Sequence, residues 1–254
     1  MTQLSEGSAG AEQLALEFGG RTHYGQLIAP YLADDVRSCS FCDYLHPLVL
    51  LEGRFCYLTL AIGQIVRGYA QICPYAHRTS AAALEAEEVS EVLTMKALVR
   101  KAFVTVYGSR GVVIENGRPA PARWGAATAA NARSLDYHTH IHCIPAAVDI
   151  RPDLRRVATE YAVGSMDDLR ALRTETFAGG PYMFFETVEG EGYVYPIDGL
   201  DLPSQFLRTC VARRLGVEER GDWRRHPGME MIAEARRELV PVVRVLWEQT
   251  GDQR

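Results

Sequence analysis

The chain has 254 residues, of which 47% are hydrophobic and 23% are charged, and its formal net charge is −5. This composition is that of an ordinary globular protein with enough apolar residues for a core. The negative charge argues against a surface that coats nucleic acid, so we expect no nucleic-acid partner. No apolar stretch approaches the ~18 residues of a membrane helix, and residues 1–10 lack the plan of a signal peptide. We therefore expect a cytoplasmic protein without a membrane partner.

The hydrophobic pattern predicts an α+β fold with an antiparallel sheet. Three strands, a long helix and two more strands follow one another in the first 145 residues. The helix is acidic at its start and basic later, which suits the helix dipole. The expected elements are a helix over 11–32, strands over 48–52, 54–61 and 69–74, the long helix from Ser80 to about Tyr107, and strands over 111–115 and 137–145.

Residues 151–254 predict a smaller α+β region. Ser165 precedes an acidic turn and is expected to cap a helix. Two strands are expected to form a hairpin over 182–196, around a Glu-Gly-Glu-Gly turn. Helices are expected over 204–215 and 229–250.

The six cysteines are too few for a disulfide scaffold in a chain of this length. Only Cys39 and Cys42 have the spacing of metal ligands, and such a pair alone needs two more ligands to complete a site. The other four stand singly among apolar residues, where buried free thiols are expected. These are Cys56, Cys73, Cys143 and Cys210.

Three histidines alternate with other residues shortly before a proline: His138, His140 and His142 precede Pro145. The whole chain has only seven histidines, so composition alone does not explain three of them within five residues. In a strand every second side chain lies on one face, so the three imidazoles are expected to point the same way. Such a row can bind a metal, hold a phosphate, or offer one ring as a nucleophile.

This run resembles the motif of the histidine-triad (HIT) superfamily of nucleotide hydrolases and transferases. Three further segments are similar to motifs of zinc-containing HIT proteins and stand in the same order. They are Cys-Ser-Phe-Cys over 39–42, the segment Gly68 to His77 with Tyr69 in place of the usual first histidine, and the strand that ends in Asn116-Gly117. The resemblance covers about residues 36–150.

The resemblance implies a HIT-like catalytic domain over 36–150, in which a long helix crosses an antiparallel sheet. Residues 1–35 are then an N-terminal tail and helix, and residues 151–254 are a C-terminal α+β extension. Part of this extension, around Leu202–Arg208, is faintly similar to the C-terminal region of CwfJ-type proteins. Relatives usually pair two HIT units, as a homodimer or within one chain, and the sequence does not decide between these arrangements.

The resemblance assigns the chemistry to His140, which attacks the α-phosphate of a nucleotide-like substrate and forms a nucleotidyl-histidine intermediate. Water or another acceptor then releases the nucleotide. His142 is expected to donate to the phosphoryl oxygens. Contacts to phosphate or base are assigned to Asn116, Ser134 and Phe41. The Asn-Gly pair at 116 equally suits a turn, and an aromatic ring at 41 is equally at home in a core.

The resemblance also completes a metal site, because His77 and His138 occupy the positions that supply its other two ligands. Together with Cys39 and Cys42 they suit a closed tetrahedral structural site for Zn²⁺. The ion would fix the orientation of His138, two residues from the nucleophile, without Lewis-acid chemistry. The alternative is a reduced, metal-free cysteine pair in which His77 has no ligand role.

Three departures from the family pattern predict a changed substrate. Ala61 stands where many relatives carry an aspartate used on the ribose hydroxyls, and Ser134 stands where they often carry glutamine. A Pro-, Gly- and Ala-rich segment over 117–131 is longer than the family usually has.

The leading expectation is thus an enzyme that cleaves or transfers at a P–O or P–N bond. Two other functions stay open at this point. The three histidines can instead bind a catalytic metal, although rings on one face of a strand lie about 7 Å apart per step, which suits one ion poorly. Alternatively, the chain is a catalytically retired nucleotide-binding or scaffold protein.

Overall fold

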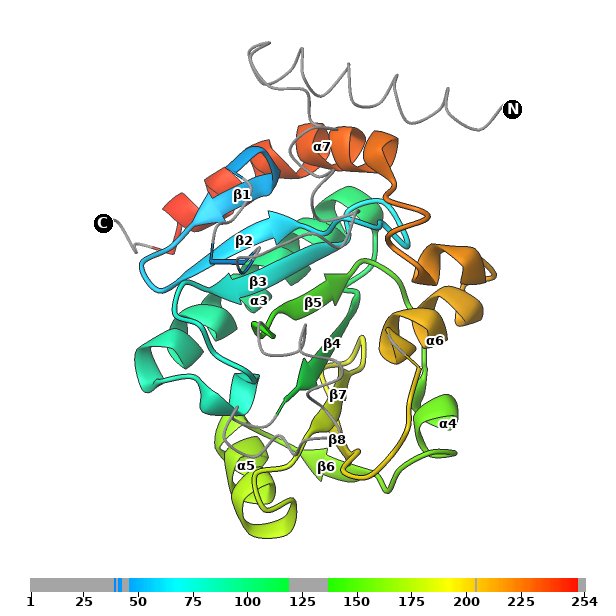
Figure 1. The fold of residues 1–254 in the computed structure, drawn as a ribbon. Helices are drawn as coiled ribbons and strands as arrows, with labels where there is room; N and C mark the ends of the chain where they lie inside the picture. Colours follow the sequence, from blue (N-terminus) through cyan, green and yellow to red (C-terminus); the bar gives the residue numbers. More distant parts are fainter. Residues whose placement is uncertain (1–38, 40, 43–45, 119–136, 204, 251–254) are drawn as a thin grey trace.

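The structure is a computed structural model, and it shows mixed α/β structure around one eight-stranded antiparallel sheet (Figure 1). The helix expected over 11–32, Ser134 and most of the segment 117–131 lie outside the described residues. Within the described ranges, no helix is both long enough and apolar enough to cross a membrane. The residues described are 39, 41–42, 46–118, 137–203 and 205–250.

The strand order is β1-β2-β3-β5-β4-β7-β8-β6, and all neighbouring strands are antiparallel. The expected strands of the first 145 residues and the expected hairpin are all present, with shifted ends. The strands are Val49–Glu52 (β1), Cys56–Leu60 (β2), Ala70–Pro74 (β3), Val112–Gly117 (β4), Ile141–Ile144 (β5), Tyr161–Val163 (β6), Tyr182–Glu186 (β7) and Gly192–Pro196 (β8).

The sheet continues across the boundary expected at residue 150. All of β7 pairs with β4, from Glu186 opposite Val113 to Tyr182 opposite Gly117. β8 and β6 then extend the sheet beyond β7. The C-terminal region therefore adds strands to the sheet that carries the HIT-like segments, in place of forming a separate sheet.

Helices cover both faces of the sheet (Figure 1). α3 (Ala86–Tyr107) and α7 (Met229–Glu248) pack against each other and share a core with β1, β2 and β3. α6 (Phe206–Arg214) and α4 (Arg151–Leu154) share a core with the opposite face. The remaining short helical pieces are α5 (Met166–Ala171), His46–Leu48, Ala81–Ala83, Leu172–Thr176 and Glu218–Gly221.

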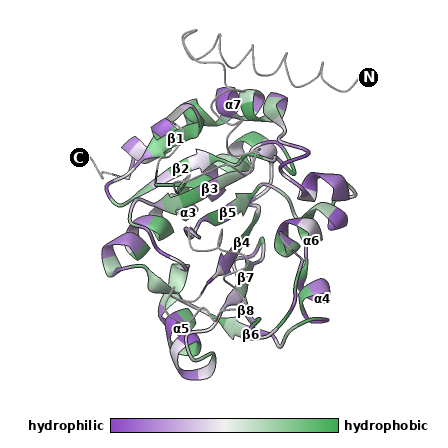
Figure 2. Ribbon diagram, in the orientation of Figure 1, coloured by the Kyte–Doolittle hydropathy of each residue, from purple (hydrophilic) through white to green (hydrophobic). Residues whose placement is uncertain are grey.

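Alternation along the strands separates these two cores. In β4, Val113 belongs to the core beneath α3 and α7, whereas its neighbours Val112 and Ile114 belong to the core beneath α6. Figure 2 shows hydrophilic and hydrophobic residues alternating around α6 and α7, as expected for helices with one face on a sheet. The four cysteines expected as buried free thiols are confirmed as such: Cys56, Cys73, Cys143 and Cys210.

The long helix begins later than expected. Ser80 precedes only a 3-10 turn over Ala81–Ala83, and α3 starts after Glu85. Glu85 and Glu88 form a reciprocal capping box, in which each side chain accepts from the other residue's backbone N–H. At its other end, α3 stops at Gly108, which adopts the left-handed conformation.

Glu91 on α3 fixes the turn between β1 and β2. The residue is 7% exposed, and its carboxylate accepts hydrogen bonds from three successive backbone N–H groups. The donors are Arg54, Phe55 and Cys56, at 2.7, 2.6 and 2.6 Å. A buried carboxylate is costly unless it is hydrogen-bonded, and these three donors offset that cost. The interaction ties the first two strands to the helix that crosses the sheet.

We expect Glu91→Ala to lower the free energy of unfolding by about 3 kcal/mol, because it leaves the three backbone donors without their charged acceptor. Urea denaturation measures this difference. The matched control is Glu87→Ala, an exposed position on the same helix. It is expected to cost only about 0.5 kcal/mol through the helix dipole. Equal midpoints for wild type and Glu91→Ala would contradict the assignment.

Candidate metal centre and histidine site

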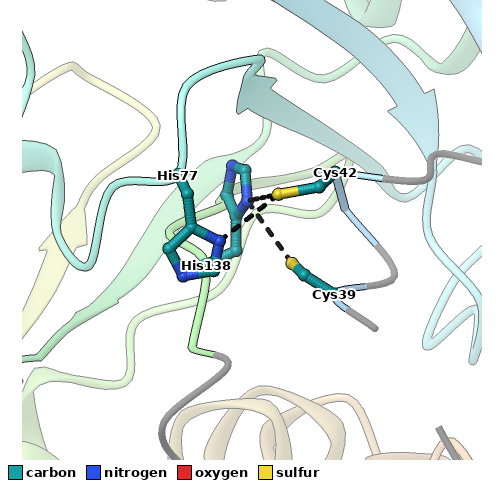
Figure 3. Close-up of side chains that lie close together, drawn as sticks. All are labelled: Cys39, Cys42, His77 and His138. Atoms are coloured by element: carbon teal, nitrogen blue, oxygen red, sulfur yellow. Dashed lines mark hydrogen bonds between the residues drawn. The ribbon is translucent and has the colours of Figure 1, made fainter. Parts of the chain in front are cut away.

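Four side chains from distant parts of the chain converge, with their thiol and imidazole groups facing one another (Figure 3). They are Cys39, Cys42, His77 and His138, the four ligands expected from the sequence. One ligand atom of each lies within 4.8 Å of the others. His138 is buried, Cys39 is half-buried, and the other two are exposed. The structure therefore brings together a cluster that could hold a metal ion.

Three sulfur–nitrogen distances within the cluster suit tetrahedral coordination. Sγ of Cys42 lies 3.3 Å from Nδ1 of His77 and 3.5 Å from Nδ1 of His138. Sγ of Cys39 lies 3.6 Å from the same nitrogen of His138. In a tetrahedral site with metal–sulfur bonds of about 2.3 Å and metal–nitrogen bonds of about 2.0 Å, these ligand atoms lie ~3.5 Å apart. The residues present thus fit such an ion.

A hydrogen bond determines which nitrogen of His138 faces the cluster. Nε2 of His138 lies 2.8 Å from the carbonyl oxygen of Pro74. A carbonyl can only accept, so Nε2 carries the proton and Nδ1 keeps its lone pair toward the thiols. Burial lowers the pKa of His138 to about 4. The ring is therefore neutral at neutral pH, as a metal ligand must be.

His140 is held by the same kind of contact, with its nitrogens in the opposite roles. Its Nδ1 donates to the carbonyl oxygen of His138 at 2.9 Å, so the lone pair of the neutral ring lies on Nε2. Among the described residues, Nε2 of His140 has no hydrogen-bond partner. Burial lowers the pKa of His140 to about 4. A neutral ring with an available lone pair is the state that a nucleophile requires.

Phe41 lies flat against the ring of His140. The two ring centroids are 4.4 Å apart and the planes differ by 17°. The ring of Tyr137 is tilted by 38° to the same histidine ring, and the two centroids are 5.9 Å apart. Because Phe41 stands between the two cysteines of the cluster in the sequence, these cysteines and the stacked ring belong to one short segment.

His142 lies within the sheet, where it pairs with Gln71 of β3 and Ile114 of β4. Its Nδ1 lies 2.5 Å from the hydroxyl oxygen of Tyr69 and 3.3 Å from Nε2 of Gln71. Its ring meets that of His140 edge to face, with 4.5 Å between centroids. Burial lowers the pKa of His142 well below its usual range, so this ring is neutral too.

The prediction of one strand with three parallel imidazoles is wrong. β5 begins at Ile141, so His138 and His140 precede it and only His142 belongs to the ladder. His138 faces the thiols, whereas the rings of His140 and His142 face each other. The backbone leaves the ladder before Ile141 because Thr139 makes other hydrogen bonds.

These other hydrogen bonds lead to a buried glutamate. The N–H of Thr139 donates to the carbonyl oxygen of Arg78 at 2.6 Å, and its hydroxyl donates to Oε1 of Glu115 at 2.9 Å. Glu115, on β4, also accepts from the N–H of Ala81 at 3.1 Å. Burial raises the pKa of Glu115 to about 6. Glu115 therefore positions the residue between the first two histidines.

The residues assigned to phosphate and base are placed as follows. Asn116 lies in β4 opposite Met183, so the Asn-Gly pair continues a strand and is not a turn. The carbonyl oxygen of Asn116 accepts a hydrogen bond from the hydroxyl of Tyr137. Phe41 contacts the nucleophile candidate, as described above. Ser134 lies outside the described residues.

Arg208 is a residue of this site that the sequence analysis did not assign. It reaches from α6 to the hydroxyl oxygen of Tyr69, to which its Nη1 donates at 2.9 Å. The two residues are 139 positions apart, so no local pattern could show the contact. The sequence signals were Tyr69, which stands where the family pattern has histidine, and the resemblance of Leu202–Arg208 to CwfJ-type proteins.

Comparison with known proteins gives distant relatives. No protein-family model matches the chain. It is 28% identical over 200 residues to CWF19-like protein 1 of Homo sapiens, of Pongo abelii and of Mus musculus. Each match covers 73% of this chain and 34% of the relative, so the chain spans about a third of the length of these proteins. The matches are consistent with the resemblance to CwfJ-type proteins.

We expect Glu115→Gln to change the pH dependence of stability. Because the fold raises the pKa of Glu115 from 4.5 to about 6, its contribution is fully present below about pH 4.5 and is lost as the pH rises through about 6. Wild type should therefore lose about 1 kcal/mol of unfolding free energy, relative to the variant, between pH 5 and pH 7. Urea denaturation at the two pH values tests this, and parallel profiles would contradict it.

Proposed function

We propose that the chain is a HIT-type enzyme that cleaves or transfers at a P–O or P–N bond of a nucleotide-like substrate, with His140 as the nucleophile. The proposal rests above all on the hydrogen bond from Nδ1 of His140 to the carbonyl oxygen of His138. This bond directs the ring's lone pair to Nε2. The order of the HIT-like segments along the chain gives separate support.

In the proposed first step, Nε2 of His140 attacks the α-phosphorus. A nitrogen–phosphorus bond forms while the bond to the leaving group breaks, and the leaving group takes a proton from water. The positive charge that develops on the ring of His140 is stabilised because Nδ1–H already points at the carbonyl oxygen of His138. His142 lies beside this ring and can donate to a phosphoryl oxygen.

In the second step, water or an acceptor hydroxyl attacks the same phosphorus. The nitrogen–phosphorus bond breaks, the attacking oxygen gives its proton to water, and His140 returns to its neutral form. Phe41 stacks on the ring and Tyr137 contacts it, and these contacts restrict the direction of Nε2. Such positioning is a principal source of rate enhancement in a two-step displacement.

We further propose that the cluster of cysteines and histidines holds Zn²⁺ in a structural role. Two thiolates and two imidazole nitrogens form a closed tetrahedral donor set with no position for a reacting water. The ion would fix Cys39 and Cys42 and, with them, the ring of Phe41 between them. It would thereby hold Phe41 on His140, and it would fix the backbone at His138 that accepts the hydrogen bond from His140.

The geometry favours this function over a catalytic metal held by the three histidines. Nδ1 of His138 faces the two thiols, and Nδ1 of His140 donates to a carbonyl. Nδ1 of His142 is in contact with Tyr69. Three nitrogens with these different partners do not share one coordination centre.

The substrate is expected to differ from that of an ordinary nucleotide-binding HIT protein. Ala61, at the position of the ribose-binding aspartate, is fully buried and offers only a methyl group. Recognition of the ribose hydroxyls from this position is therefore absent. A test of the function therefore needs a panel of substrates that differ both in the base and in the leaving group.

We expect His140→Ala to lower nucleoside monophosphate release by at least about 10³-fold, because it removes the nucleophile. The substrates are nucleoside 5′-phosphoramidates, dinucleoside polyphosphates and nucleotide sugars. His226→Ala, which removes an exposed histidine, is the control and should keep full activity. Undiminished release by His140→Ala would refute the proposal. No release by folded, metal-loaded wild type would favour a retired, nucleotide-binding protein.

We expect purified protein to carry about one zinc ion per chain, and Cys42→Ala to lose most of it, since an incomplete donor set binds zinc far more weakly. Mass spectrometry of the metal content measures both. Cys210→Ala is the control, because it removes a buried thiol from the other core and should leave the zinc in place. A zinc content unchanged by Cys42→Ala would show that the cluster is not the site.

A further inference from the structure

A chain of hydrogen bonds runs from α6 to the last histidine of the triad. Nη1 of Arg208 lies 2.9 Å from the hydroxyl oxygen of Tyr69, and this oxygen lies 2.5 Å from Nδ1 of His142. The three residues are 6%, 0% and 3% exposed. Because these groups are buried, solvent does not compete for their hydrogen bonds, and each proton must be placed within the chain.

The positions of the protons follow from the chemistry of the two ends. A guanidinium group has only donors, so the oxygen of Tyr69 accepts from Arg208. The single O–H of Tyr69 is then left to donate to Nδ1 of His142. Burial raises the pKa of Tyr69, so this proton stays on the oxygen. Nδ1 of His142 is therefore an acceptor, and a neutral ring must carry its own proton on Nε2.

The opposite tautomer conflicts with its surroundings. If Nδ1 of His142 carried the proton, the oxygen of Tyr69 would face two donors, and its own O–H would have no acceptor among the described residues. The N–H of Gln71, whose Nε2 lies 3.3 Å from the same Nδ1, would then also point at a donor. Unsatisfied buried donors are disfavoured by about tenfold or more each.

We propose that Tyr69 and Arg208 are positioning residues that hold His142 in the Nε2–H form, so that the ring presents an N–H donor to the phosphoryl group attacked by His140. The role of this donor rests on the proposed function. The tautomer itself is a property of the folded chain. Within the described part of the chain, Nε2 of His142 has no other hydrogen-bond partner and remains available to a substrate.

Two further hydrogen bonds hold the guanidinium of Arg208 in place. Its Nη2 donates to the carbonyl oxygen of Gly63 at 2.7 Å, and its Nε donates to that of Gly221 at 3.3 Å. Gly63 has a φ of +79°, and a Cβ there would lie 2.2 Å from Cβ of Trp223. Only glycine therefore allows the loop before β3 to approach the C-terminal segment this closely.

The charge of Arg208 also favours a ligand with an anionic phosphoryl group. Its hydrogen-bond partners in the described ranges are carbonyl oxygens and the hydroxyl of Tyr69, and it forms no ion pair with a carboxylate there. A buried guanidinium without a carboxylate leaves a positive potential beside His140 and His142. Such a potential attracts an anionic group, and a phosphoryl group is the anion that the proposed chemistry requires.

The test is a measurement of the tautomer of His142 by long-range ¹H–¹⁵N correlation in the full chain, labelled with ¹⁵N-histidine and assigned with His142→Gln. Wild type is expected to show neutral Nε2–H. Tyr69→Phe removes one oxygen and should raise the Nδ1–H population at least about tenfold, because Nδ1 loses its principal donor. Arg208→Met should do the same, since Tyr69 can then accept as well as donate.

Two further variants separate positioning from general damage to the fold. Tyr195→Phe removes another buried tyrosine hydroxyl, which is bonded to Glu160 elsewhere in the sheet, and should leave the tautomer of His142 unchanged. Arg208→Lys keeps a charged donor and should retain most of the wild-type tautomer. If Arg208→Met does not fold, Tyr69→Phe decides the matter.

On a substrate identified by the panel, Tyr69→Phe is expected to lower kcat about 10- to 100-fold with little change in KM, because the lost donor acts on the charge of the transition state. Nδ1–H in wild-type His142, or a tautomer that Tyr69→Phe does not shift, would overturn the inference. An inactive wild type with the expected tautomer and the expected shifts would support this inference and count against the proposed function.

Discussion

A neutral imidazole has one N–H and one lone pair, so the partner of either nitrogen determines what the other can do. This constraint organises the whole site. His138 gives its N–H to the carbonyl of Pro74 and turns its lone pair to the thiols. His140 gives its N–H to the carbonyl of His138, which leaves the lone pair on Nε2. His142 faces a donor in Tyr69 and, on our proposal, keeps an N–H for the substrate. The groups around each of the three rings thus determine which nitrogen it leaves available.

The cysteine–histidine cluster and His140 are coupled because both depend on His138. Its ring belongs to the cluster while its carbonyl holds His140. Phe41 forms a second link, since it stands between the two cysteines and stacks on His140. A structural ion at this place would influence catalysis through orientation alone, because a shift of the segment 39–42 moves the stacked ring and a shift of His138 moves the hydrogen-bond acceptor.

The sequence allowed much of this to be predicted, and its failures have physical causes. The cysteine pair, the antiparallel sheet and the cap at Ser165, which accepts from the N–H of Asp168, follow from spacing, alternation and local hydrogen bonding. The two histidines of the cluster follow only from the family resemblance. The strand end at Ile141 does not, because it depends on contacts of Thr139 with residues far along the chain. The hydrogen bond from Arg208 to Tyr69 could not be predicted for the same reason, since the two residues are 139 positions apart.

The pairing of β4 with β7 has a consequence for any attempt to isolate the HIT-like part. A fragment that ended near residue 150 would lose β7 and leave the backbone groups of Val113–Gly117 as an open edge, next to the strand that carries His142. Exposed edges of this kind template association with other chains. Such a fragment would also expose the apolar face of the sheet that α6 covers. The boundary suggested by the motifs is therefore a poor place to cut the protein, and aggregation of the fragment would say nothing about its chemistry.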